Sequence, residues 1–340
     1  MKLNELKIGS HIAKVPIIQG GMAVRISTAR LAAAVAEEGG VGLIAATCMS
    51  FEELRAEIRL ARSLTSGIIG INVLVASQVF SDLVKIAIEE GIDLVVAGAG
   101  FSREVFKLGE KAGTPIVPIV SSVKGAKLSE VLGATAIIVE GKEAGGHLGT
   151  NQSIRTIFPA IKQSVNIPVV AAGGIMNGKD IVDMINLGAD GVQMGTRFAA
   201  SEEANGAPAL KEFYLRAQWK DILLIDSPLG LPGRSIQNPF VKKLAEGYVP
   251  APEHCRNCLK HCTRNFCIVD ALIRAQQGEV DTGLVFSGEY IHKIGEILSV
   301  REIFARLLRE VGEVKAGNRQ NGNWTVDRAY KDCSLVSFQG

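Results

Sequence analysis

The sequence of 340 residues has little aromatic content and little charge. Aromatic residues make up 5% of the chain and charged residues 21%, and no basic tract is interleaved with aromatic side chains, so no nucleic-acid partner is expected. No apolar run reaches the roughly 18 residues of a membrane span, so no membrane association is expected. Residues 1–10 lack the apolar core of a signal peptide, and the sequence therefore predicts a cytoplasmic protein.

Apolar residues and glycine are abundant instead. Hydrophobic residues make up 47% of the chain, which is enough for a large buried core. The 37 glycines suit a protein with many strand-to-helix turns and with backbone close to a ligand. The length is ordinary for an α/β barrel that carries additions.

Short, mostly β-branched apolar runs alternate with helical patterns over the first 200 residues or so. Such runs are typical of strands buried on both faces. Eight β/α units predict a (β/α)8 barrel of the TIM type over residues 1–225. A doubly wound open sheet is the alternative, although no GxGxxG follows the first strand. The expected strands are 15–18, 41–45, 68–73, 94–97, 116–119, 136–139, 169–172 and 191–194, and the expected helices include 28–38, 51–64, 81–90 and 179–187.

The alternation stops near residue 209. Segment 227–240 holds three prolines and two glycines, which predicts a loop without regular structure. Helical periodicity returns over 297–312, and this helix is expected to pack back on the barrel. We therefore predict a C-terminal extension over 226–315, with no second domain, and a flexible tail over 316–340.

Glycines follow several of the expected strands, where barrel enzymes place their sites. Gly20 and Gly21 follow the first strand, Gly173 and Gly174 the seventh, and Gly195 the eighth. Glycine loops after strands seven and eight form the usual phosphate site of such barrels. Tight turns are the alternative reading of each loop taken singly. Together the loops predict a phosphate-bearing ligand such as FMN or a sugar phosphate.

Two polar side chains stand out near these loops. His147 lies among four glycines in segment 140–149, after the sixth strand, which makes it a candidate acid or base. A surface histidine that caps a helix is the alternative. Asn72 lies within the apolar third strand and needs polar partners there, either from a ligand or from a neighbouring loop.

Four segments of the chain resemble the nitronate monooxygenase family, formerly called 2-nitropropane dioxygenases. The FMN-dependent enoyl-acyl-carrier-protein reductases share most of these motifs, and the resemblance covers about residues 1–315. The segments are residues 16–22 (PIIQGGM), 140–149 (EGKEAGGHLG), 171–175 (AAGGI) and 193–198 (QMGTRF).

The resemblance implies an enzyme with non-covalently bound FMN. It implies oxidation of nitronates or nitroalkanes with His147 as the active-site base, or alternatively the reduction of an enoyl thioester or a related activated alkene. The reductase would draw electrons from NAD(P)H or through an iron–sulfur cluster. The positions that match the family's flavin contacts are Gly20, Gly21, Met22, Asn72, Glu140, Gly145, Ala172, Gly173, Gly174, Gly195 and Thr196.

A cysteine cluster departs from the family pattern. Soft thiolates suit zinc or an iron–sulfur cluster. The short spacings of C-x2-C-x3-C-x4-C favour a [4Fe–4S] cluster, served by a ferredoxin-type electron partner, over zinc, which more often uses two separated CxxC knuckles. His254 and His261 flank the run as substitute ligands or as surface polarity. The cysteines are Cys255, Cys258, Cys262 and Cys267.

Arg25 and Cys48 are two further candidate residues near the expected site. Arg25 follows the first glycine loop and either contacts an anionic group of a ligand or is a solvated residue at a helix start. Cys48 follows the second strand and could line the pocket, although a buried cysteine in such a place is more often inert. Barrels of this kind often pair, so a homodimer is also expected.

Overall fold

The computed structural model describes residues 3–22, 24–248 and 255–320. Eight parallel strands close into a barrel, which confirms the predicted TIM barrel and excludes the open sheet. Each expected strand is present, with ends that differ by at most two residues. In barrel order the strands are β10 (Val169–Ala172), β11 (Gly191–Met194), β3 (Ile17–Gln19), β4 (Val41–Ala45), β5 (Ile68–Leu74), β6 (Leu94–Gly98), β7 (Ile116–Val120) and β8 (Ile137–Glu140).

Helices connect these strands, and α2, α5, α6 and α7 begin at residues whose side chains cap them. Ser50 and Glu53 form a capping box at the start of α2, and the Asn177 side chain accepts from the Asp180 N–H at the start of α7. Their apolar faces cover the outside of the barrel. The helices are α1 (Ala29–Glu37), α2 (Phe51–Leu64), α3 (Phe80–Glu89), α4 (Arg103–Ala112), α5 (Val123–Val131), α6 (Ile154–Lys162), α7 (Gly178–Asn186) and α8 (Thr196–Ala199).

One end of the barrel is closed by an N-terminal hairpin. Its strands are β1 (Leu6–Ile8) and β2 (His11–Ala13), which pair antiparallel. Leu6 and Ile8 are buried in the same cluster as Ile18 and the other inward-facing side chains of the barrel. Because this end is filled, a ligand has to enter at the opposite end, where the strands terminate.

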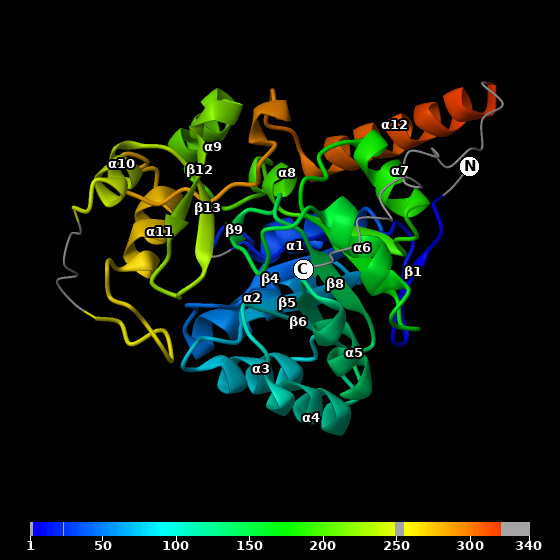
Figure 1. Cartoon of the computed structure of the whole chain (residues 1–340). Helices are drawn as coiled ribbons and strands as arrows, with labels where there is room; N and C mark the ends of the chain where they lie inside the picture. The colour runs from blue at the N-terminus through cyan, green and yellow to red at the C-terminus, as the bar shows by residue number, and fades with distance from the viewer. Residues whose placement is uncertain (1–2, 23, 249–254, 321–340) are drawn as a thin grey trace, which may run out of the picture.

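The chain after α8 builds an extension over the open end of the barrel (Figure 1). Its β12 and β13 pair antiparallel, and β13 also pairs with β9 (Gly146–His147), which belongs to the loop after β8. The domain boundary predicted at 225/226 falls at the end of β12. The elements are α9 (Pro208–Arg216), η1 (Trp219–Asp221), β12 (Ile222–Asp226), β13 (Pro232–Ile236), α10 (Pro239–Ala245), α11 (Ile268–Gln276) and η2 (Ile291–Lys293).

The prediction of an irregular loop over 227–240 was wrong, because β13 and the start of α10 lie within it. Pro232 is the first residue of its strand, a position that proline tolerates. Asn238 caps α10 and Pro239 occupies its first turn, where a missing N–H costs nothing. The prolines therefore mark the ends of elements here.

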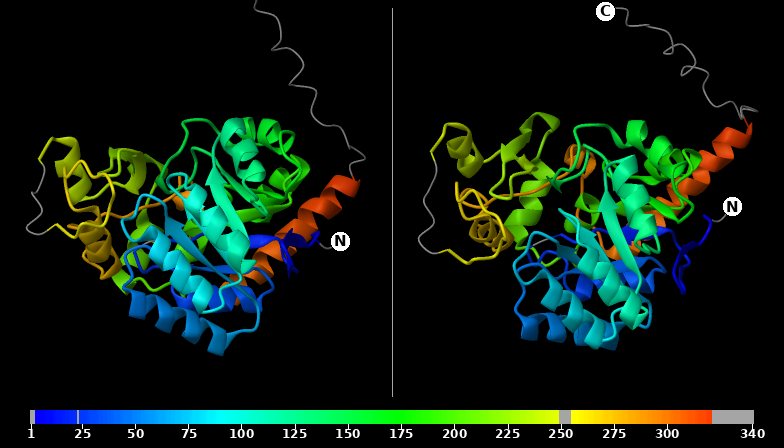
Figure 2. Two further views of the ribbon diagram at one scale, coloured as in Figure 1. Left: turned by 90° about the horizontal axis from the view of Figure 1, so that it is seen from below. Right: turned by 60° about the horizontal axis from the view of Figure 1, so that its bottom comes forward.

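The C-terminal helix α12 (Val300–Gln320) packs on the barrel against α7 and α1, as expected for residues 297–312. It continues through residues 316–320, where the tail was expected to begin, and residues 321–340 lie outside the described part. The extension and α12 lie on opposite sides of the molecule (Figure 2). None of the described helices is both long and apolar enough to cross a membrane.

Candidate active site at the open end of the barrel

One cavity opens where the barrel strands end, between the barrel and the extension. The structure brings all twelve predicted ligand-contacting and catalytic positions to its wall. Residues of the barrel strands or of the loops that follow them therefore share one chamber with the extension. The predicted positions are Gly20, Gly21, Met22, Asn72, Glu140, Gly145, His147, Ala172, Gly173, Gly174, Gly195 and Thr196.

His147 is held by the extension. Its Nε2 lies 2.7 Å from the Ser227 Oγ, and the Phe286 ring contacts the imidazole edge-on with 5.3 Å between centroids. Burial lowers the pKa of His147 to about 4. The imidazole is therefore neutral near pH 7 and can accept a proton.

The glycines around the cavity serve two purposes. Gly145 is needed by the protein itself, because a Cβ there would lie 2.6 Å from the Ser287 carbonyl carbon. Gly173 and Gly174 adopt φ values of +107° and +71°, which favour glycine. Gly195 differs, because a Cβ would meet only Met22, at 3.7 Å. At Gly195 the small residue therefore leaves space for a ligand rather than for the protein.

Polar groups without protein partners face this space. The Gln193 Oε1 on β11 is buried and has no hydrogen-bond partner among the described residues. The Asn72 Nδ2 makes one long contact, of 3.4 Å, to the Gly21 carbonyl. Buried polar groups need partners. The cavity wall therefore suits a flat ligand that carries hydrogen-bond donors and acceptors along its edges.

Glu140, at the end of β8, adds a carboxyl group to this wall. Burial raises its pKa to about 8, so the folded protein keeps this proton at neutral pH. An unfolded chain releases it near its ordinary value of 4.5. The folded state consequently binds an extra proton between these two values, and stability falls as the pH rises through that window.

Glu140→Gln should therefore stabilise the ligand-free protein at high pH. We expect the variant to melt about 5 °C above the unmodified protein at pH 9, and the two to melt together near pH 4. Thermal unfolding followed by circular dichroism measures this, with Glu110→Gln on the exposed face of α4 as the control. If the melting temperatures of Glu140→Gln and the unmodified protein depend on pH in the same way, another group titrates.

The outer part of the cavity is apolar and is built by the extension. Its lining comes from α9, α11 and the strand segment around Phe286. No lysine or arginine is among the described residues that line either part of the cavity. The apolar residues from the extension are Leu210, Tyr214, Leu229, Leu259, Ile268, Val269, Leu272, Leu284, Val285 and Phe286.

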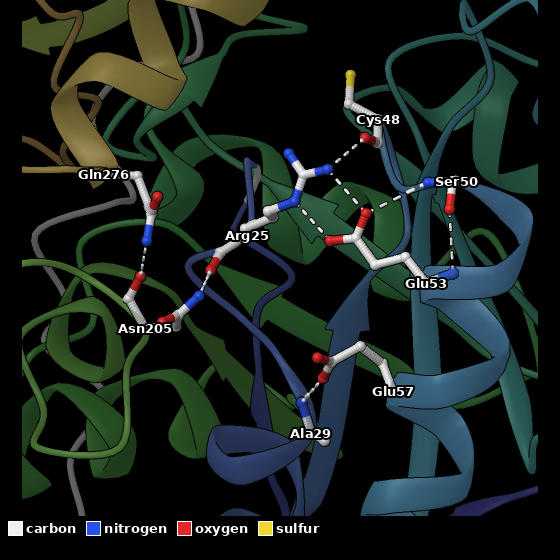
Figure 3. Close-up of polar contacts among 8 residues, drawn as sticks. All are labelled: Arg25, Ala29, Cys48, Ser50, Glu53, Glu57, Asn205 and Gln276. Atoms are coloured by element: carbon white, nitrogen blue, oxygen red, sulfur yellow. Dashed lines mark hydrogen bonds and ion pairs between the residues drawn. The ribbon is translucent and has the colours of Figure 1, made fainter.

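Arg25 is not among the described residues that line the cavity, and its charge is already paired. Its Nε lies 2.5 Å from the Glu53 Oε1 and its Nη2 donates to the Cys48 carbonyl at 3.4 Å (Figure 3). The hydrogen bond to Glu53 raises the pKa of Arg25, and the same bond lowers the pKa of Glu53. Asn205, itself bonded to Gln276 of α11, holds the Arg25 carbonyl at 3.0 Å. Arg25 thus anchors the first glycine loop.

Sequence reasoning missed two polar residues of this site, Gln193 and Ser227. Gln193 interrupts an apolar strand as Asn72 does, so the same signal could have identified it. Ser227 carried no signal, because its partner His147 is 80 residues away in the chain. Cys48 lines the cavity, and burial raises the pKa of its thiol to about 12, which agrees with an inert side chain.

The predicted metal site is not assembled. Within the described residues, no three side chains of His, Cys, Asp or Glu converge as metal ligands. Cys255, Cys258 and Cys262 instead line a separate groove as free thiols, with Cys267 beside it at the start of α11. His261 lines the same groove, and His254 lies outside the described residues.

Known proteins resemble this chain in sequence and in structure. The family model described as nitronate monooxygenase matches residues 4–310. A probable nitronate monooxygenase of Staphylococcus aureus is 32% identical over 282 residues, 69% of this chain and 79% of that protein. The structure of FabK from Thermotoga maritima superposes with a TM-score of 0.81 at 34% identity, over 90% of this chain and 96% of FabK.

A third relative points to a different substrate. It is a (3aS,4S,5R,7aS)-5-hydroxy-7a-methyl-1-oxo-octahydro-1H-indene-4-carboxyl-CoA dehydrogenase of Mycobacterium tuberculosis, 31% identical over 235 residues. The match covers 68% of this chain and 66% of that enzyme. The chain thus spans slightly less than two thirds of this relative.

Proposed function

The chain belongs to the nitronate monooxygenase family of oxidoreductases, and on this premise we propose that it is an FMN-dependent enzyme that reduces activated alkenes in neutral, apolar substrates. The observation that carries this proposal is the lining of the cavity, which combines a neutral histidine with an apolar outer part and has no cationic side chain among its described residues.

The residues of the inner cavity fit FMN. The Gly173–Gly174 turn and the start of α8 at Gly195 and Thr196 offer backbone N–H groups at the ends of β10 and β11, where a phosphate would bind. The unpartnered amide of Gln193 suits the hydrogen-bonding edge of a flavin or the hydroxyls of its ribityl chain. When bound, the flavin supplies two-electron transfer to or from the substrate.

His147 would assist this reaction at the substrate carbonyl. Reduction of an alkene conjugated to a carbonyl adds a hydride equivalent to the β-carbon and a proton to the α-carbon. A neutral imidazole next to the substrate carbonyl can donate a hydrogen bond to it, while the proton for the α-carbon comes from solvent. The apolar outer wall around Leu272 and Leu284 would exclude water and hold a hydrocarbon body.

The test measures how the rate depends on the acyl chain length of an enoyl thioester. FMN-loaded protein is mixed anaerobically with NADH or NADPH and with enoyl thioesters of increasing chain length, and flavin reoxidation is followed by absorbance. Reduced ferredoxin replaces the nicotinamide in a parallel series. We expect reoxidation by long enoyl thioesters at least about tenfold faster than by the four-carbon thioester, since each buried CH2 contributes ~0.8 kcal/mol. Equal rates at all chain lengths would contradict an apolar substrate site.

Nitronate oxidation is the second candidate, supported by the family match and by the name of the Staphylococcus relative. There His147 would take a proton from the carbon next to the nitro group. The uncharged wall argues against it, because an anionic nitronate would find no cationic partner among the described lining residues. Oxygen uptake with ethylnitronate that exceeds every thioester rate would establish this function instead.

A metal at the four cysteines is a separate proposal. Three of them share one groove, and a metal would have to draw the thiolates together on binding. We expect anaerobically purified protein to contain about four iron atoms per chain for a [4Fe–4S] cluster, or about one zinc. Metal analysis before and after Cys258→Ser decides it, with Cys333→Ser as the control, because Cys333 is, apart from Cys48, the remaining cysteine outside the run. Unchanged metal content in Cys258→Ser would refute the site.

Two further expectations accompany the function. We propose that the enzyme is cytoplasmic. We also propose a homodimer, by analogy with other barrels. Analytical ultracentrifugation of the full chain tests the dimer, which a single species at 36.2 kDa would exclude.

A further inference from the structure

Ser227 lies in a tight turn that the extension holds against His147. The turn joins β12 to β13, and it is closed by hydrogen bonds from the Gly230 N–H to the Ser227 carbonyl at 2.9 Å and from the Ser227 N–H to the Leu231 carbonyl at 3.3 Å. Ser227 is only 3% exposed. The Oγ position is therefore set by backbone bonds that do not involve the imidazole.

The imidazole is fixed from the other side as well. His147 pairs with Gly233 of β13, and the Leu148 N–H donates to the Pro232 carbonyl at 2.9 Å. Phe286 contacts the ring edge-on, and Gly233 makes room for it, since a Cβ there would lie 3.0 Å from the Phe286 ring. One extension hairpin therefore supplies both the backbone and the hydroxyl that orient this side chain.

The two ring nitrogens have different surroundings. Nε2 lies 2.7 Å from the Ser227 Oγ, whereas Nδ1 has no hydrogen-bond partner among the described residues. Because His147 lines the cavity and Nε2 is occupied, Nδ1 is the nitrogen left for a substrate. The nitrogen that serves the reaction is thus determined by the contact with Ser227.

The proton count at Ser227 allows two arrangements. A hydroxyl has one hydrogen and two acceptor lone pairs, and one lone pair already accepts from the Leu229 N–H at 3.3 Å. The other can accept Nε2–H, which leaves Nδ1 free as a base. Alternatively, the hydroxyl donates to Nε2, which places the proton on Nδ1 as a donor. Rotation about the Cβ–Oγ bond, together with exchange of the imidazole proton between Nε2 and Nδ1 through solvent, converts one arrangement into the other.

We propose that Ser227 is a positioning residue that aims the Nδ1 of His147 at the substrate. Because its hydroxyl can either accept from Nε2–H or donate to Nε2, Ser227 accommodates both neutral tautomers of His147, so that Nδ1 can face the substrate as a proton acceptor or as a hydrogen-bond donor. This role rests on the proposed function. It requires an uncharged partner, because a carboxylate in place of Ser227 would fix the proton on Nε2 and favour the imidazolium.

The charged groups nearby are occupied elsewhere. Arg234 of β13 donates to the carbonyls of Lys142 and Ala144, at 2.6 and 3.1 Å, and lies 3.7 Å from the Glu289 carboxylate. Glu143, from the loop after β8, accepts from the Ile154 N–H at 3.0 Å. Glu140 faces the same cavity and is protonated near pH 7. The depressed pKa of His147 accordingly comes from burial.

The first test needs no turnover. The full chain, labelled with 15N-histidine, is examined by NMR, and the five histidine signals are sorted with His147→Ala. In the unmodified protein we expect exchange-averaged shifts at both ring nitrogens of His147, and in Ser227→Ala a shift to a single tautomer. Ser227→Asp should raise the His147 pKa by at least about one unit. Identical His147 spectra in the unmodified protein and Ser227→Ala would overturn the proposal.

The second test measures catalysis. We expect Ser227→Ala to lower kcat about tenfold, the equivalent of one lost hydrogen bond, with KM and flavin content unchanged. Ser227→Thr keeps the hydroxyl and should restore at least half of the lost rate. Ser235→Ala is the matched control, because Ser235 is a buried serine of the same hairpin whose Oγ has no partner among the described residues.

The two tests separate the two proposals. If Ser227→Ala alters the His147 tautomer but neither it nor the unmodified protein reduces an alkene, the contact between Ser227 and His147 is supported and the proposed function is refuted. Turnover that survives Ser227→Ala at the full rate would refute the role of Ser227 and leave the proposed function intact.

Discussion

His147→Ala is expected to slow the substrate half-reaction by about 10²–10⁴-fold while FMN stays bound, which is the usual contribution of a positioned acid or base. The imidazole lines the cavity, and its replacement leaves the predicted flavin contacts of the barrel in place. Stopped-flow reoxidation of the reduced flavin by an enoyl thioester measures this directly.

No other side chain of the described cavity is as well suited to accept a proton near pH 7. Glu140 is protonated at neutral pH, and Glu143 already accepts a hydrogen bond from the Ile154 N–H. Desolvation raises the pKa of Tyr290, so its phenol is a weak acid. His147 is the remaining group whose neutral form can exchange a proton near pH 7.

The pH dependence follows from the same burial. Since the pKa of His147 falls from 6.5 to about 4, the imidazole is neutral through the whole physiological range. A step that needs the neutral ring should be flat from neutral pH down to about pH 5 and should decline as the pH falls through 4. In Ser227→Asp this decline in rate should begin closer to neutral pH.

The control is His11→Ala in β2, at the closed end of the barrel, which should leave the rate unchanged. Full activity of His147→Ala with every substrate class would remove His147 from the mechanism. Loss of flavin in that variant would instead assign His147 to cofactor binding, and flavin absorbance of the purified protein distinguishes the two results.

The barrel was predictable from the sequence because its strands are buried on both faces. Segments such as 41–45 and 169–172 are continuous apolar runs, since one side faces the barrel core and the other faces a helix. The glycine loops could be ordered by strand number alone, because all carboxyl ends of a parallel barrel meet at one rim.

The extension was not predictable in the same way, because its secondary structure depends on contacts between residues that are far apart in the sequence. β13 pairs with β9, which lies more than 80 residues earlier in the chain and is only two residues long. A two-residue strand has no periodicity to read. The local signal that was available, Asn238 followed by Pro239 as a helix start, was interpreted as part of a loop.

The second large effect is expected for Gly195→Val, which should abolish FMN binding without unfolding the protein. Gly195 has φ −99° and ψ −71°, a conformation open to other residues, and a Cβ there would lie 3.7 Å from the Met22 sulfur. A side chain at Gly195 thus meets no backbone. Its methyl groups would occupy space that the inner cavity reserves for a ligand.

Substitution of the neighbouring glycines would not separate an effect on flavin binding from an effect on folding. Gly174 has φ +71°, and a Cβ there would lie 2.8 Å from the Tyr290 ring, so any larger residue disturbs the fold. Gly145 faces the Ser287 backbone in the same way. A loss of flavin in those variants would report on folding as much as on binding.

We expect the FMN dissociation constant of Gly195→Val to rise about 100-fold, which corresponds to an overpacking cost of ~3 kcal/mol. The melting temperature of the flavin-free protein should stay within about 2 °C of that of the unmodified chain. Gly295→Val is the control, since nothing lies within 4 Å of a Cβ there. Unchanged FMN affinity in Gly195→Val would place the phosphate away from the ends of β10 and β11, and the cofactor would then have to bind at another part of the cavity.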